Sequence, residues 1–194
     1  PAKRYAVVLL PCQVRQLRLL QATGVATNVT VVVELVCNYL PKPAWTLDIC
    51  RKVGVDKPTS VLYRSDGWPG TTRIQGQDER GETVDVGVPH VSVWTNDAAR
   101  SGMPQCLQCL RMQGGADLTV GCPWFEPFDQ LGTGKTVVRV HRDEMLPYLR
   151  AAELAGALVL EPRERAMYPK HVAPIAKVKH ARAQGTVQRL LTWY

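Results

Sequence analysis

VLYRSDGWPGTTRIQGQDERGETVDVGVPHVSVW, residues 61–94, is the stretch of sequence that decides the fold. Apolar and polar residues alternate in four short runs, 61–64, 71–75, 83–88 and 91–94, which is the pattern of half-buried strands. Turn-forming sequences separate the runs, and an Arg-Gly pair at Arg80-Gly81 suits a hairpin whose glycine takes a positive φ. The stretch therefore predicts an antiparallel meander of about four strands.

The residues before the meander predict a strand and helices. Tyr5–Leu10 is an apolar run closed by Pro11, typical of a buried strand, and Gln13–Gln21 has the apolar spacing of a helix. Ala26–Leu40 fits both a strand, because it is rich in valine, and a helix, because of the spacing of its apolar residues. Its length favours the helix. Thr46–Val53 predicts a short helix that Thr46 can cap and the following glycine can end.

The last third of the chain predicts a strand–helix–strand unit. Thr136–His141 alternates as a strand, and Asp143 can cap a helix that Gly156 ends. Ala157–Leu160 is an apolar run that predicts a second, buried strand. The tail that follows Pro162 is polar and basic. The apolar face of the helix would hold Met145, Leu146, Leu149, Ala152 and Ala155.

Together these elements predict an α+β fold. Its antiparallel central sheet would have flanking helices, a cysteine-containing loop insertion and a basic C-terminal segment. We divide the chain into residues 1–56 (N-terminal strand and helices), 57–127 (meander and cysteine loop) and 128–194 (strand–helix–strand and basic tail). A chain of 194 residues is long enough to bury one good core, so we expect one compact domain.

The charge distribution predicts a nucleic-acid partner. The chain carries 24 basic and 17 acidic residues, a net charge of +7, and no acid occurs in residues 1–33 or 165–194. Basic ends could form one electropositive face for phosphate groups, with nearby aromatic rings stacking on bases, although solvation alone also explains such charges. The predicted phosphate contacts are Arg4, Arg15, Arg18, Lys170, Lys177, Lys179, Arg182 and Arg189.

The cysteines suggest a structural zinc site. Cys106 and Cys109 are spaced as in a Cys-x-x-Cys pair, and Cys122 follows in the same glycine-rich region. Zinc prefers four such ligands, so we expect His141 to complete the site, with His90 as a second choice and Cys37 or Cys50 within possible reach. The alternative is that these thiols pack as small apolar side chains.

The function predicted first is a non-catalytic nucleic-acid-binding subunit of a larger nucleoprotein assembly, with RNA or single-stranded nucleic acid as the expected partner alongside other proteins. A second hypothesis is a small enzyme acting on a nucleotide or phosphorylated substrate, in which His141 works with Asp143 or Glu144. A third is a protein-interaction subunit whose basic ends bind an acidic partner. No catalytic motif decides among these hypotheses.

The cysteine content and the hydropathy predict the compartment. Six cysteines in 194 residues are too few for a disulfide scaffold, so we expect an intracellular, reducing environment. The most apolar segment, Gly24–Leu40, is interrupted by Asn28, Glu34 and Asn38 and falls short of a membrane span. We therefore expect no membrane partner.

One resemblance to a known family concerns Tyr5–Leu40. Its predicted strand, Leu10-Pro11, an amphipathic helix containing glutamines, and a second helix after Gly24 resemble the opening of transposon-associated RNA-guided nucleases. The resemblance covers about a fifth of the chain and implies a nucleic-acid-facing element without catalysis. We do not adopt it, because the chain is too short for the nuclease domain of that family.

Overall fold

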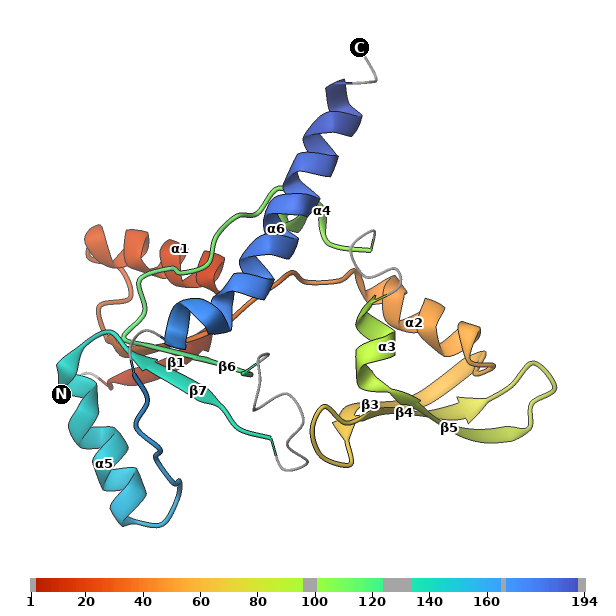
Figure 1. The fold of residues 1–194 in the computed structure, drawn as a ribbon, viewed down its shortest axis with the longest axis horizontal. Helices are drawn as coiled ribbons and strands as arrows, with labels where there is room; N and C mark the ends of the chain where they lie inside the picture. The colour runs from red at the N-terminus through yellow and green to blue at the C-terminus, as the bar shows by residue number, and fades with distance from the viewer. Residues whose placement is uncertain (1–2, 96–100, 124–133, 165–166, 192–194) are drawn as a thin grey trace. The chain divides into compact units, whose positions relative to one another are not determined.

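The computed structural model describes residues 3–95, 101–123, 134–164 and 167–191 (Figure 1). Contacts divide the chain into two compact units, each assembled from three segments. The first unit consists of residues 1–38, 110–123 and 136–178, and the second of residues 39–109, 124–135 and 179–194. We describe each unit by itself.

The first unit is built on a mixed sheet of four strands. Its elements are β1 (Tyr5–Leu9), α1 (Pro11–Ala22), β2 (Val29–Leu35), β6 (Leu118–Gly121), β7 (Val137–Val140), the 3-10 helix η1 (Asp143–Met145) and α5 (Leu146–Leu154). The strand order is β1-β2-β6-β7; β1, β2 and β6 run parallel, and β7 pairs with β6 in the antiparallel direction.

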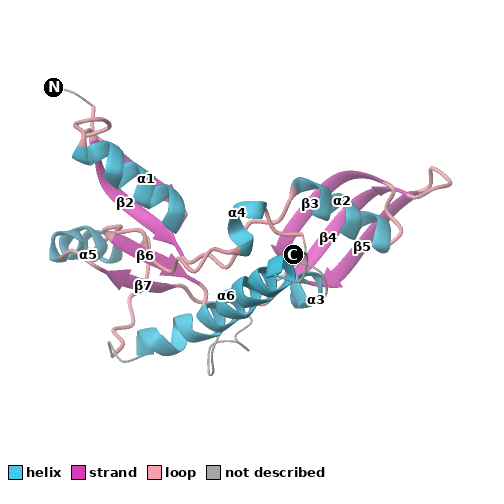
Figure 2. Cartoon of the chain, turned by 90° about the horizontal axis from the view of Figure 1, so that it is seen from above, coloured by secondary structure: helices cyan, strands magenta, loops and turns pink. Residues whose placement is uncertain are grey.

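Helix α1 covers one face of this sheet, as Figure 2 shows. Val14 of α1 packs on Val32 of β2 and on Ala116, and these three side chains form the buried core of the unit. The helix follows β1 directly because Pro11 fits the first helical position, where its missing N–H costs nothing. Gly114 lies so close to α1 that an added Cβ would meet the carbonyl oxygen of Pro11 and the side chain of Val14.

The second unit contains the antiparallel meander. Strands β3 (Lys57–Ser65), β4 (Thr71–Gln77) and β5 (Thr83–Pro89) pair in sequence order. Its helices are α2 (Pro43–Lys52), α3 (His90–Thr95) and α4 (Pro104–Leu107). Helix α6 (Met167–Leu191) begins within the first unit and ends within the second. The buried core consists of Cys50, Val55 and Ile74.

The predicted α+β class is confirmed, and so is the antiparallel meander for its first three strands. Gly81 takes the expected positive φ of 81° in the hairpin between β4 and β5. The predicted fourth strand, Val91–Trp94, is wrong: these residues lie in the helix α3, because four alternating residues are too few to distinguish a strand from one helical turn.

Three further predictions need correction. Ala26–Leu40 is not a helix but contains β2, because its valines find strand partners on both sides, in β1 and β6. Ala157–Leu160 is not a strand; Val159 is 89% exposed and pairs with no strand, so the strand–helix–strand unit does not form. The polar tail instead forms α6, which continues through Pro174. Of the predicted apolar face 145–155, Met145 alone is buried.

None of the helices among the described residues is both long enough and apolar enough to cross a membrane.

Candidate functional site

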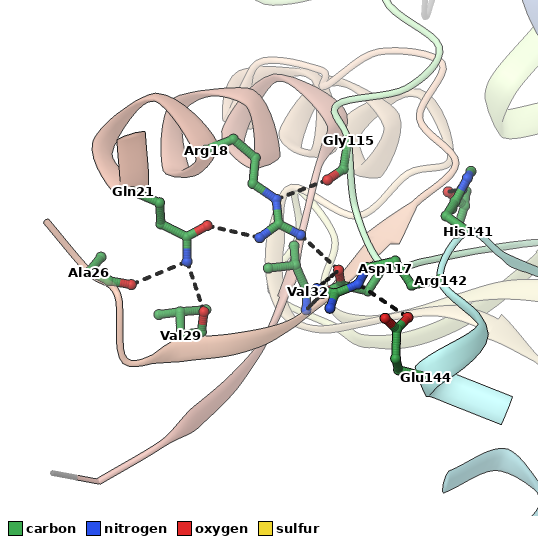
Figure 3. Close-up of polar contacts among 11 residues, drawn as sticks. Arg18, Gln21, Ala26, Val29, Val32, Gly115, Asp117, His141, Arg142 and Glu144 are labelled. Atoms are coloured by element: carbon green, nitrogen blue, oxygen red, sulfur yellow. Dashed lines mark hydrogen bonds and ion pairs between the residues drawn. The ribbon is translucent and has the colours of Figure 1, made fainter. Parts of the chain in front are cut away.

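A buried carboxylate, Asp117, lies immediately before β6 and beneath α1. Arg18 of α1 and Arg142, which follows β7, each donate a hydrogen bond to its Oδ1, at 3.0 and 3.2 Å, and both converge on it in Figure 3. The backbone N–H of Val32 donates to its Oδ2 at 2.7 Å. Asp117 therefore joins three parts of the first unit and leaves neither of its oxygens without a donor.

A second buried carboxylate, Glu34, lies on β2 directly beside Thr119 of β6. The backbone N–H of Gly114 donates to Oε2 of Glu34, and the hydroxyl of Thr119 donates to Oε1 at 3.2 Å. Burial raises the pKa of Glu34 above its usual value of 4.5, and these two hydrogen bonds oppose that shift only in part. Burial thus favours the protonated form of Glu34 more than water would.

The same hydroxyl connects Glu34 to a histidine at the surface. Oγ1 of Thr119 lies 2.7 Å from Nε2 of His141, the residue that follows β7. Partial burial and the nearby Arg139 lower the pKa of His141, whereas Asp117 opposes this shift. Glu34, Thr119 and His141 form a continuous row of hydrogen-bonding groups from the interior to an exposed imidazole.

The second unit has its own polar cluster around His90, the first residue of α3. Nε2 of His90 accepts a hydrogen bond from Arg64 at 3.0 Å, and Nδ1 lies 3.0 Å from the hydroxyl of Thr72. Because Nε2 accepts, Nδ1 carries the proton and donates to Thr72. Burial first, and then the charge of Arg64, lower the pKa of His90 to about 4. The guanidinium of Arg64 also lies 4.8 Å from the centre of the Trp68 ring.

Some of the described residues that were predicted to contact phosphates are exposed, and others make internal contacts. Arg4, Arg15 and Lys177 are exposed, whereas Arg18 is bound to Asp117. Lys179 and Arg182 of α6 are buried: Nζ of Lys179 lies 3.9 Å from Sγ of Cys109, and the guanidinium of Arg182 lies 4.8 Å from the centre of the Tyr39 ring. The side chains of Lys170 and Arg189 lie outside the described residues.

The residues predicted to bind zinc are divided between the two units. Cys106 and Cys109 belong to the second unit, and Cys122 and His141 to the first. Within the described residues there is no group of three or more cysteine, histidine or acidic side chains that could hold a metal ion. His90, the second choice, has both ring nitrogens engaged by Arg64 and Thr72. Cys50, another candidate, is part of the core of the second unit.

The hypothesis of a general base at His141 paired it with Asp143 or Glu144. Nε2 of His141 instead contacts Thr119, and Glu144 forms an ion pair with Arg142 at 3.6 Å. Sequence reasoning missed the carboxylates of Glu34 and Asp117. Glu34 could have been noticed because it is the first acidic residue of the chain and lies inside an otherwise apolar run. Asp117 could have been noticed because it stands between a pair of glycines and a short apolar strand.

Comparisons with known proteins place this chain in a family. Residues 2–166 match the family model that describes the C terminus of the beta subunit of coenzyme F420 hydrogenase/dehydrogenase. This match extends over most of the 194 residues. The chain belongs to this family.

One solved structure with a similar fold comes from the F420-reducing [NiFe] hydrogenase complex of Methanosarcina barkeri. The two chains share 17% sequence identity with a TM-score of 0.54. The similarity covers 99% of this chain and 63% of the chain from the complex, so this chain spans less than two thirds of the protein that it resembles. A comparison with curated proteins found no match.

The prediction of a nucleic-acid-binding protein is wrong. Membership of a hydrogenase/dehydrogenase family overturns this prediction. It also argues against the resemblance to RNA-guided nucleases. The physical reason is visible in the structure, where three of the eight predicted phosphate contacts serve internal interactions: Arg18, Lys179 and Arg182. The sequence gives the number of basic residues and the net charge, but it does not show which of the basic side chains face solvent.

Proposed function

We propose that this chain is part of a subunit of a redox enzyme complex, and that its first unit helps to bind coenzyme F420. The single observation that carries the proposal is the family match over residues 2–166, which includes every strand of the first unit and both buried carboxylates. Coenzyme F420 is a deazaflavin, and when bound it supplies a ring that accepts or releases a hydride. The structural zinc predicted from the cysteines has no comparable support.

The carboxyl edge of the parallel strands is the place that we propose for the coenzyme. In parallel sheets, ligands bind outside the carboxyl ends of the strands, and anionic groups bind at helix N-termini. Helix α1 begins at this edge, with Cys12 exposed in its first turn. No acidic residue occurs in 10–12, 36–38 or 121–123, the segments that end or follow β1, β2 and β6, and Glu34, near the end of β2, is fully buried. The solvent-facing part of the edge therefore suits the anionic tail of a deazaflavin coenzyme.

The face of the same sheet that lies opposite α1 supports protein partners, because some of its apolar side chains are exposed among the described residues. Side chains that point away from α1 are apolar on all four strands, and Val8, Leu35 and Val138 among them are 60%, 41% and 36% exposed. Parallel strands are normally covered on both faces. A parallel sheet with exposed apolar side chains on one face is therefore suited to a subunit that works in an assembly.

A binding measurement with matched charge variants tests the proposal. The full chain is titrated with coenzyme F420, and binding is followed by the fluorescence of the coenzyme. Cys12→Asp places a negative charge in the first turn of α1, whereas Ala22→Asp places the same charge at the last residue of that helix. We expect Cys12→Asp to weaken binding by about 3- to 30-fold, as for charge interactions at a helix N-terminus, and Ala22→Asp to change it less than about twofold.

The proposal fails if the parent chain does not bind the coenzyme. If both variants weaken binding equally, the coenzyme binds elsewhere and the assignment to the carboxyl edge is wrong.

A further inference from the structure

We propose that Glu34, Thr119 and His141 form a proton relay between solvent and the interior of the first unit. The three groups are aligned by the sheet itself: Glu34 and Thr119 are directly paired across β2 and β6, and His141 follows β7, the next strand. Oγ1 of Thr119 lies within hydrogen-bonding distance of both Oε1 of Glu34 and Nε2 of His141, at 3.2 and 2.7 Å.

The position of the inner end suits proton delivery. Glu34 is fully buried, and an added Cβ on the adjacent Gly114 would touch both Oε2 of Glu34 and the first residue of α1. The carboxylate therefore lies beside the start of α1, at the carboxyl end of the parallel strands. A hydride transfer at that edge has to be accompanied by proton movement, so the relay rests on the proposed function for its biological use.

The hydrogen bonds can point in two directions, and this property allows a proton to pass. With Glu34 ionised, Thr119 donates to Glu34 and accepts from the Nε2–H of His141. A solvent proton that binds Nδ1 of His141 allows the Nε2 proton to move to Thr119 and the hydroxyl proton of Thr119 to move to Oε1 of Glu34. Glu34 is then protonated, and His141 is neutral with its proton on Nδ1. The first state returns in two steps: Glu34 gives up its proton to an acceptor at the interior end, and the Thr119 hydroxyl turns back to donate to Glu34. His141 then loses its Nδ1 proton to solvent and takes up another on Nε2.

Partial burial, and then the charge of Arg139, favour a neutral resting form of His141. Arg139 on β7 opposes protonation of His141, and Asp117 before β6 favours it, but Asp117 is already bound to Arg18 and Arg142. Close to Glu34, the partners on the surrounding elements are the N–H of Gly114 and the hydroxyl of Thr119, neither of which carries a charge. The inner end can therefore hold a proton without disrupting an ion pair.

The variant Glu34→Gln makes the direction of the relay measurable. Because the N–H of Gly114 must donate to the oxygen of the new amide, the NH₂ group of that amide has to face Thr119 and donate to it. Thr119 can then only donate to His141, which must place its own proton on Nδ1. In the parent chain with Glu34 ionised, His141 carries the proton on Nε2. The substitution should therefore reverse the tautomer of His141 without touching the histidine.

The experiment is ¹⁵N NMR of the histidine rings in the full chain at alkaline pH, without coenzyme. We expect the ratio of the two His141 tautomers to shift by at least about tenfold in Glu34→Gln, the ratio that one ordinary hydrogen bond supports. With Thr119→Ser as the background, Glu34→Gln should produce the same shift, whereas with Thr119→Val it should have no effect on His141. His90, in the second unit, serves as a control for folding and should remain protonated on Nδ1 in every variant.

An unchanged His141 tautomer in Glu34→Gln would overturn the relay, as would a tautomer that still responds to residue 34 in Thr119→Val. Because the protein contains no coenzyme in this measurement, its outcome is independent of the binding titration with coenzyme F420. The relay and the proposed function can therefore fail separately.

Discussion

His90 should make the stability of the second unit depend on pH. The folded protein holds this histidine with a pKa of about 4, compared with 6.5 for an unperturbed histidine, because the side chain is buried and contacts Arg64. In the unfolded chain His90 binds a proton below pH 6.5, but in the folded chain it does so only below about pH 4. The free energy of unfolding is therefore largest above pH 6.5 and decreases as the pH falls towards 4.

The loss of stability at low pH can be calculated from the shift in the pKa of His90. Each pKa unit corresponds to about 1.36 kcal/mol, so the decrease in stability due to His90 is about 3 kcal/mol. The assay is urea unfolding at pH 7 and pH 4, followed by tryptophan fluorescence. This signal reports the second unit, because no tryptophan occurs in residues 1–38, 110–123 or 136–178. The matched variant is His90→Gln, which cannot titrate in this range.

We expect the parent chain to lose about 3 kcal/mol more than His90→Gln between the two pH values. A difference below about 0.5 kcal/mol would refute the reasoning, since effects of that size are ordinary for substitutions of little consequence. The same conclusion would follow if NMR showed the ring of His90 titrating near pH 6.5 in the folded protein.

Three further predictions concern the first unit. Gly114→Ala should destabilise the first unit by more than about 2 kcal/mol, because the new Cβ would press against α1. Gly115→Ala should cost only about 1 kcal/mol, because its new Cβ has no atom within 4 Å but its φ of +94° disfavours a side chain. Urea unfolding followed by circular dichroism compares the two variants. Asp117→Ala should cost about 3–5 kcal/mol in the same assay, because it leaves Nη2 of Arg18 and the buried backbone N–H of Val32 without their acceptor. The raised pKa of Glu34 means that its ionisation disfavours the folded state, so stability should decrease as the pH rises from 4.5 through that pKa, and Glu34→Gln should abolish this decrease.

Sequence reasoning worked where local signals and tertiary partners agree. The strands β3, β4 and β5 could be predicted because each pairs with its neighbour in sequence, and Gly81 marks the turn. Sequence reasoning failed at β2, because one of its two partner strands is distant in sequence. The decisive pairing is with Leu118 to Val120 of β6, more than 80 residues away. The run 157–160 failed for the opposite reason, because an apolar pattern predicts a strand only if another strand is available to it.

The candidate site was partly visible in the sequence. His141 was singled out as a zinc ligand and as a general base, and the structure instead shows it bonded to Thr119. The roles of Glu34 and Asp117 depend on contacts between β2, β6 and α1, which periodicity does not reveal. Charge counting was misleading for Lys179 and Arg182, because a cation that a helix buries contributes to net charge as much as an exposed one does.

The interleaving of the two units has a consequence for the order of synthesis. Strand β2 ends at Leu35, and its neighbour β6 begins at Leu118, so the whole segment 39–109 of the second unit is translated between them. At roughly 5–20 residues per second, one edge of β2 waits several seconds for its partner. The meander has no such delay, since β3, β4 and β5 follow one another. On the ribosome, the later-starting unit can thus complete its sheet first, while the nascent β1–α1–β2 segment exposes an unpaired strand edge that chaperones or early partners would have to shield.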